Sequence, residues 1–176
     1  MPSDLDLLLE AASFAARAHR HQLRKDKETP YAAHTFRVCL IARQVFGIDD
    51  PKVLAAALLH DTIEDTATDY DDLAERFGDD VARWAAGLTK DMRLPDDERE
   101  NVYREHLAHA EWPVLACKLA DIYDNLTDSK HLPAEQRTRT LERSRSYLKA
   151  MKPAIPPELK VAFELTEAKL NEVAKL

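Results

Sequence analysis

Apolar residues recur along most of the chain at the three- and four-residue spacing of amphipathic helices. We expect Ser3 or Asp4 to cap the first helix, and the second to begin near Tyr31 and stop at Gly47. No segment alternates like a strand, and only three glycines occur in the chain. The pattern predicts an all-α protein. Its amphipathic segments are 5–16, 31–46, 73–77, 81–88, 102–110, 134–151 and 158–176.

Two further segments, 53–59 and 114–120, are apolar on almost every side, as expected of helices buried in a core. Both change to ionisable residues within one step, the first at His60 and Asp61 and the second at Asp121. A carboxylate at the end of a buried helix is costly unless it is paired or binds a metal. Because buried helices of one bundle pack together, we expect these polar ends to meet.

The length of 176 residues fits one domain with a sizeable core. We predict a single domain over residues 1–176, with the motifs in about 12–132 and C-terminal helices in 134–176. The last helix fits equally well against the bundle or against a second copy of the chain. A homo-oligomer is therefore left open.

The cysteines and the start of the chain indicate where the protein works. Cys39 and Cys117 each lie in an apolar helical run and form no CxxC pair, which favours thiols in a reducing compartment. Residues 1–4 are polar and acidic, unlike a secretory signal. No apolar stretch approaches the roughly 20 residues that span a bilayer. We expect a cytoplasmic protein with no membrane partner.

The net charge of −7 at pH 7 argues against general binding to nucleic acid. It also means that an anionic ligand needs a locally basic pocket. One basic cluster, which includes Arg24 and Lys25, follows the first helix. Cations are favourable at a helix C-terminus because of the helix dipole, and composition alone favours that explanation over an anion contact.

The stretch His60-Asp61-Thr62-Ile63-Glu64-Asp65 combines one imidazole with three carboxylates. On a continuous helix, Glu64 lies one turn beyond His60, and Asp65 lies one turn beyond Asp61. The first pair suits a divalent cation, and the second suits proton transfer beside it. A solvated helix end explains an isolated His-Asp pair equally well. The metal interpretation therefore needs partners elsewhere in the chain.

His34 and Asp121 are the candidate partners. His34 stands near a predicted helix start, and Asp121 follows the second buried segment. With His60 and Asp61 they make two imidazoles and two carboxylates, which suit Mn, Fe, Zn or a similar cation with positions left for water and substrate. Water on such a cation becomes a hydroxide nucleophile near neutral pH, while the cation polarises a phosphoryl oxygen.

The order H…HD…D resembles that of the HD-type phosphohydrolase superfamily. More narrowly, the chain looks like the hydrolase domain of the Rel/Spo alarmone enzymes and the stand-alone small alarmone hydrolases. An HD dipeptide alone is weak evidence, whereas HDxxED joined to RK…PYxxH and KLAD…N is specific. The matching segments follow the family's order: 21–25, 30–34, 56–66, 77–78 with 81, 87–90, and 118–121 with 125.

This resemblance implies an HD-type helical bundle that holds a manganese ion, although another divalent transition metal fits the same donors. The implied ligands are His34, His60, Asp61 and Asp121. The implied reaction is hydrolysis of the 3′-pyrophosphate of ppGpp (guanosine-3′,5′-bis(diphosphate)), which yields GDP and pyrophosphate. No room remains for a synthetase domain, so synthesis of the alarmone is not expected.

The resemblance also assigns the remaining site residues. Glu64 and Asp65 match paired catalytic acids that position or deprotonate the attacking water and assist the leaving group. Arg24 and Lys25 match residues that line the nucleotide pocket, and Asn125 matches a polar contact near the ribose and phosphates. This reverses the composition-based interpretation of Arg24 and Lys25, because an acidic protein needs local cations to hold a polyanion.

Three positions depart from the family's pattern. Ile122, Asp124 and Thr127 stand where basic or aromatic residues are usual. The loss of positive charge near Asp121 affects which substrate the protein takes more than whether it binds a metal. We therefore keep two alternatives to ppGpp hydrolysis: an HD phosphohydrolase for another phosphorylated nucleotide or nucleotide cofactor, and a non-catalytic nucleotide-binding module.

Overall fold

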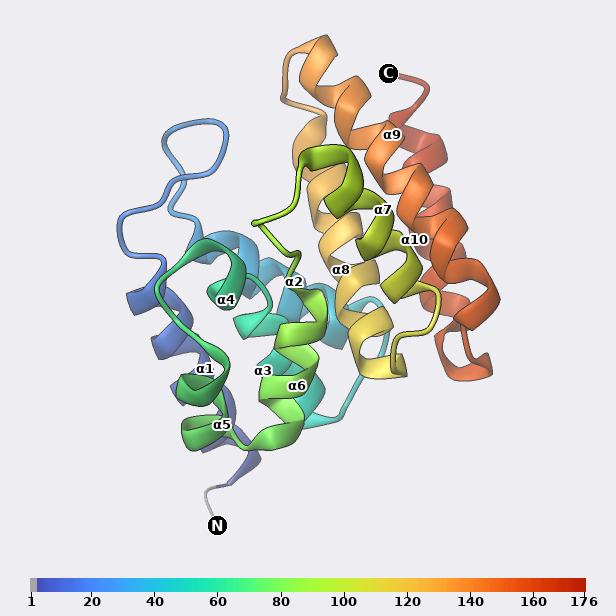
Figure 1. Cartoon of the computed structure of the whole chain (residues 1–176). Coiled ribbons are helices and arrows are strands. Elements are labelled where there is room, and N and C mark those ends of the chain that lie inside the picture. The colour runs from blue at the N-terminus through green and yellow to red at the C-terminus, as the bar shows by residue number, and fades with distance from the viewer. Residues whose placement is uncertain (1–2) are drawn as a thin grey trace. The chain divides into compact units, whose positions relative to one another are not determined.

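The computed structural model describes residues 3–176, so Met1 and Pro2 of the acidic start lie outside the described residues. Every regular element in this described part is a helix, which confirms the all-α prediction (Figure 1). None of these helices is both long and apolar enough to cross a membrane. The chain divides into two compact units, Met1–Thr89 and Lys90–Leu176. One domain over residues 1–176 stays a prediction.

Helix α3 (Pro51–Leu59) forms the core of the first unit, where it packs against α1, α2 and α6. Every side chain from Val53 to Leu59 is buried, as the apolar pattern predicts. Asp50 caps α3 by accepting a hydrogen bond from the backbone N–H of Lys52 at 2.9 Å. The other helices of this unit are α1 (Asp4–Ala18), α2 (Ala32–Gln44), α4 (Thr62–Asp65), α5 (Tyr70–Phe77) and α6 (Asp79–Leu88).

The start of α1 confirms the predicted cap. The Ser3 hydroxyl accepts from the backbone N–H of Asp6 at 3.2 Å, and the Asp6 carboxylate accepts from the Ser3 backbone N–H at 3.0 Å. This reciprocal capping box satisfies two backbone groups that a helix start otherwise leaves without partners. Helix α2 ends at Gln44, shortly before Gly47 turns the chain with a φ of 72°.

The assumption that one continuous helix runs through residues 60–65 is wrong. Helix α3 ends at Leu59, and the short helix α4 begins at Thr62. Asp61 has a φ of −104° and a ψ of 0°, between the two helices. The Thr62 hydroxyl donates to the carbonyl oxygen of Leu59 at 2.7 Å. One feature of the predicted spacing remains, because the Asp65 backbone N–H donates to the Asp61 carbonyl oxygen at 2.9 Å.

Helix α8 (Trp112–Ser129) forms the core of the second unit and packs against α9 and α10. Residues 113–122 are buried without interruption. The helix continues well past Asp121, so that aspartate lies within α8 and not at its end as predicted. The other α-helices of this unit are α7 (Asp96–Leu107), α9 (Ala134–Met151) and α10 (Lys160–Val173), with short 3-10 turns at Lys152–Ala154 and Pro157–Leu159.

Candidate functional site

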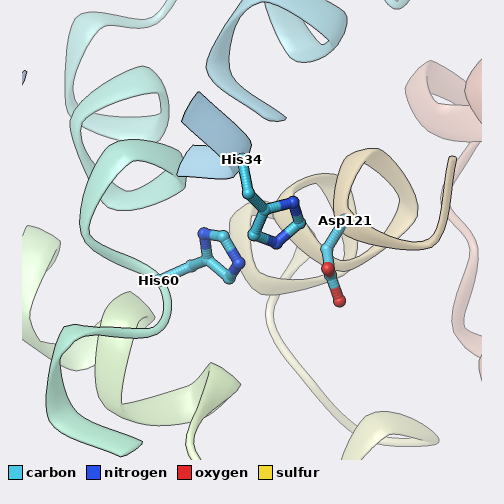
Figure 2. A group of neighbouring side chains, drawn as sticks. All are labelled: His34, His60 and Asp121. Atoms are coloured by element: carbon cyan, nitrogen blue, oxygen red, sulfur yellow. The ribbon is translucent and has the colours of Figure 1, made fainter. Parts of the chain in front are cut away.

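Two buried histidines face each other in the first unit. His34 lies in the first turn of α2 and His60 directly follows α3, and their ring centroids are 5.1 Å apart (Figure 2). His60 Nδ1 lies 2.8 Å from the carbonyl oxygen of Ala57, so Nδ1 carries the proton and Nε2 presents its lone pair. Only 1% of His34 and 2% of His60 is exposed. This burial and tautomer are typical of imidazoles that bind metals.

The Asp61 carboxylate lies close to both of these histidines. Its Oδ2 lies 2.9 Å from His60 Nε2 and 3.6 Å from His34 Nε2. Burial raises the pKa of Asp61, but His60 and His34 beside the carboxylate outweigh it and hold the pKa well below its usual value. A carboxylate oxygen therefore faces the lone pair of a neutral imidazole, which requires a proton or a cation between them. The donor set fits a divalent cation.

Tyr31 connects this cluster with the acid pair. Its hydroxyl donates to Asp61 Oδ2 at 2.6 Å. Partial burial raises the pKa of Asp65, and the nearby Asp61 carboxylate raises it further, against the lowering effect of the nearby Tyr31 hydroxyl. A raised pKa suits a carboxyl group that exchanges protons with a substrate. Glu64 is half-buried beside Asp65 in α4.

The basic residues before α2 lie in a loop built around Asp26. The Asp26 carboxylate accepts from two backbone N–H groups at 2.9 Å and from the Thr29 hydroxyl at 2.6 Å. The Thr29 hydroxyl is the main cause that lowers the pKa of Asp26 to about 2. Arg24 is half-buried with its guanidinium 5.5 Å from the centroid of the Tyr31 ring, while Lys25 is exposed. The structure therefore places Arg24 against the tyrosine that contacts Asp61.

Asp121 in the second unit is held at both of its oxygens. Lys118 Nζ donates to Oδ2 at 2.9 Å, and the Asn125 amide donates to Oδ1 at 2.5 Å. Only 8% of Lys118 is exposed, and its ammonium lies over the rings of Tyr147 and Tyr103 at 4.8 and 5.2 Å. Burial lowers the pKa of Lys118, but Asp121 and the tyrosines outweigh it and raise the pKa well above its usual value. Lys118 is therefore charged and orients the carboxylate.

The three residues that depart from the family pattern differ in how far they are buried. Ile122 and Asp124 are buried within the second unit, whereas Thr127 is exposed. The Thr127 hydroxyl donates to the carbonyl oxygen of Tyr123 one turn earlier at 2.9 Å, so it is used within α8. Ile122 extends the apolar surface of α8 in the core of the unit. A basic side chain at position 122 would need a polar partner there.

The structure brings His34, His60 and Asp61 together in the first unit, and their role as metal ligands stays a prediction. Sequence reasoning gave no role to Tyr31 or Lys118. A signal for Tyr31 is present in the sequence, because it precedes His34 by three residues at a helix start, where both side chains face the same side. Lys118 has the same spacing to Asp121. His34 and His60 of the first unit and Asp121 of the second are each buried, and each offers a ligand atom.

Comparison with known proteins identifies the family. A family model described as an HD domain matches residues 11–148. The chain belongs to the HD-domain family. Its membership, with the histidines and aspartate of the first unit, makes the protein a metal-dependent hydrolase.

Several relatives of this HD-domain protein have names that state an activity. The chain is 45% identical over 136 residues to the guanosine-3′,5′-bis(diphosphate) 3′-pyrophosphohydrolase MESH1 of Xenopus tropicalis, which covers 77% of this chain and 76% of that protein. It is 46% identical over 129 residues to the protein of the same name from Homo sapiens, with 73% and 72% covered. The alarmone-hydrolase resemblance is therefore confirmed.

A solved structure supports the same relationship. Its description is "A metazoan ortholog of SpoT hydrolyzes ppGpp and plays a role in starvation responses". The TM-score is 0.83 at 31% identity, and the match covers 99% of this chain and 96% of that one. A guanosine-3′,5′-bis(diphosphate) 3′-pyrophosphohydrolase of Aquifex aeolicus is 39% identical over 128 residues, but the match covers only 18% of that longer protein.

Proposed function

We propose that this HD-domain protein hydrolyses the 3′-pyrophosphate of ppGpp to GDP and pyrophosphate, with Mn²⁺ as its cofactor. The observation that carries the proposal is the cluster of His34, His60 and Asp61, joined through Tyr31 to the Asp65 carboxyl group. Relatives at 45% and 46% identity carry this activity in their names.

The proposed metal ligands are His34, His60, Asp61 and Asp121. The first three form a cluster in the first unit, in which both histidines are buried. Asp121 is a buried carboxylate that Lys118 and Asn125 contact, and it matches the last residue of the H…HD…D pattern. A divalent cation held by these residues would lower the pKa of water and polarise a phosphoryl oxygen. Mixed nitrogen and oxygen donors suit Mn²⁺ and related cations.

Glu64 and Asp65 are the proposed catalytic acids. Water attacks the phosphorus atom bonded to the ribose 3′-oxygen, and the bond between that phosphorus and the 3′-oxygen breaks. Asp65 and Glu64 take the proton of the water and return a proton to the 3′-oxygen, so the products are GDP with a free 3′-hydroxyl and pyrophosphate. The raised pKa of Asp65 supports this role, because a carboxyl group of higher pKa is a better base and can also deliver a proton.

Arg24, Lys25 and Asn125 are the proposed substrate contacts. A chain with a net charge of −7 needs local cations to hold a nucleotide that carries two diphosphates. Arg24 lies against Tyr31, and Tyr31 contacts Asp61, so a phosphate near Arg24 would lie close to the acids. Asn125 contacts Asp121 already, which lets one residue orient a metal ligand and meet the ribose.

The remaining proposals concern the setting of the enzyme. We place it in the cytoplasm because Cys39 and Cys117 are both thiols. The partner is a small nucleotide, with no nucleic acid and no membrane involved. Residues 1–176 act as one HD domain, and a homo-oligomer is compatible with this arrangement.

A substrate panel with the full chain tests this function. Metal-free protein reloaded with Mn²⁺ should release pyrophosphate and GDP from ppGpp, and removal of the metal with a chelator should stop the reaction. The buried Ile122 motivates one competitor, a phosphorylated nucleotide cofactor. Release of orthophosphate from that cofactor while ppGpp stays intact would favour the alternative substrate. No turnover of either compound, with a melting temperature that Mn²⁺ still raises, would favour a non-catalytic nucleotide-binding module.

A further inference from the structure

His19 is a buried histidine outside the ligand set described above. It caps the C-terminus of α1, and only 1% of it is exposed. Its Nδ1 lies 2.7 Å from Gln22 Oε1. The Gln22 amide nitrogen donates to the carbonyl oxygen of Asp65 at 2.5 Å, so Oε1 is the acceptor and His19 Nδ1 is the donor. A chain of two hydrogen bonds therefore joins His19 to the backbone of Asp65.

A second connection runs through the face of the imidazole. The His19 ring stacks on the Tyr31 ring, with centroids 4.8 Å apart and planes inclined by 30°. The Tyr31 hydroxyl donates to Asp61 Oδ2 at 2.6 Å. The Tyr31 backbone N–H also donates to the Gln22 carbonyl oxygen at 2.9 Å, so the two connections brace each other. His19 thus reaches the backbone of Asp65 on one side and the carboxylate of Asp61 on the other.

A histidine that served only to fill the core would be a poor choice at this position. His19 Nε2 is buried and has no hydrogen-bond partner among residues 3–176, which carries a desolvation cost that an apolar side chain of similar size would avoid. Burial lowers the pKa of His19, so the ring is neutral at neutral pH and keeps one donor for Gln22. The hydrogen bond to Gln22 and the contact with the Tyr31 ring therefore explain a histidine at position 19 better than core packing alone.

We propose that His19 is a positioning residue of the hydrolytic site, which fixes Gln22 and Tyr31 and through them the turn that carries Asp65 and the carboxylate of Asp61. This role rests on the proposed function, because it assigns His19 to the chemistry of those acids. It also predicts an effect on metal binding that does not depend on which nucleotide is the substrate.

The test compares His19→Leu with His19→Asn in the full chain. Leucine removes the donor and keeps apolar bulk, whereas the asparagine amide places an N–H close to the position of Nδ1 and can still donate to Gln22. We expect kcat for ppGpp to fall about 10- to 100-fold in His19→Leu while KM stays nearly constant, the size of effect seen when a supporting partner of a site residue is lost. His19→Asn should recover most of kcat.

Metal affinity and coupling complete the test. Titration calorimetry should show weaker Mn²⁺ binding in His19→Leu by about 10-fold, and less weakening in His19→Asn. Gln22→Leu should reproduce much of the loss in kcat, and the double variant should lose less than the product of the two single effects, because the residues act in one chain. His109→Leu, at an exposed histidine, serves as the control.

The outcomes separate the inference from the proposed function. If the wild-type protein leaves ppGpp intact, the proposed function fails, while the Mn²⁺ titrations still decide whether His19 supports the site. If His19→Leu and His19→Asn lose activity and metal affinity equally, and only in proportion to loss of folded protein, the inference is overturned. Unchanged kcat and metal affinity in a folded His19→Leu protein would overturn it as well. If His19→Leu does not fold, Gln22→Leu replaces it in both measurements.

Discussion

Replacing His60 with alanine will abolish Mn²⁺ binding and hydrolysis of ppGpp. His60 follows directly after the buried helix α3 and presents Nε2 to the Asp61 carboxylate, while its Nδ1 is held by the Ala57 carbonyl oxygen. Alanine removes the metal ligand itself, so the loss of kcat should exceed the roughly 10- to 100-fold that follows from loss of an outer partner. It also removes the imidazole that lies nearest to the Asp61 carboxylate.

The measurement combines titration calorimetry with a pyrophosphate-release assay. The control is His109→Ala, because His109 is exposed and its Nδ1 contacts only the nearby Glu105 carbonyl oxygen among the hydrogen bonds of the described residues. This variant should match the wild-type protein in both assays. Circular dichroism checks that His60→Ala is folded. A folded His60→Ala protein with wild-type metal content and turnover would exclude His60 as a ligand.

Replacing Asp65 with asparagine should separate catalysis from metal binding. Asparagine has nearly the same shape but cannot exchange a proton, so we expect kcat to fall by about 10²- to 10⁴-fold. The affinity for Mn²⁺ should change little, because Asp65 lies outside the proposed ligand set and its backbone contacts with Asp61 and Gln22 do not involve the carboxyl group.

Asp71→Asn is the matched control for this prediction, because Asp71 is exposed in the first turn of α5. Single-turnover kinetics and Mn²⁺ titration on both variants give the comparison. If Asp65→Asn loses metal affinity and kcat together, Asp65 supports the metal and not the proton transfer. If kcat is unchanged, Glu64 or another group carries the proton.

The helices of the core follow from local patterns in the sequence. Residues 53–59 are apolar on every side and form the buried helix α3, and Ser3 caps α1 because its hydroxyl can reach a free backbone N–H. The end of α8 was harder to predict. Polar residues follow Asp121, but residues 122–129 contain no glycine or proline, so nothing in that stretch stops the helix. A run of polar residues shows that a stretch faces solvent or a site, but it does not stop a helix as glycine or proline would.

The candidate ligands could be predicted from their residue types and order, whereas their supporting contacts could not. Tyr31 and Asp61 are 30 residues apart, and Gln22 and Asp65 are 43 residues apart. Such pairs depend on how separate helices and loops pack together, which the hydrophobic period along one helix does not specify. The break between α3 and α4 is another example, and the Thr62 hydroxyl donates there to the carbonyl oxygen of Leu59.

Hydrolysis of ppGpp in ¹⁸O-labelled water by the Mn²⁺-loaded protein tests the central claim most directly. The claim is that water attacks the phosphorus bonded to the ribose 3′-oxygen, within reach of Asp65 and the ligands around Asp61. Mass spectrometry of the products should show the label in pyrophosphate, none in GDP, and equal amounts of the two. Label in the guanosine nucleotide, or release of orthophosphate in place of pyrophosphate, would contradict the account.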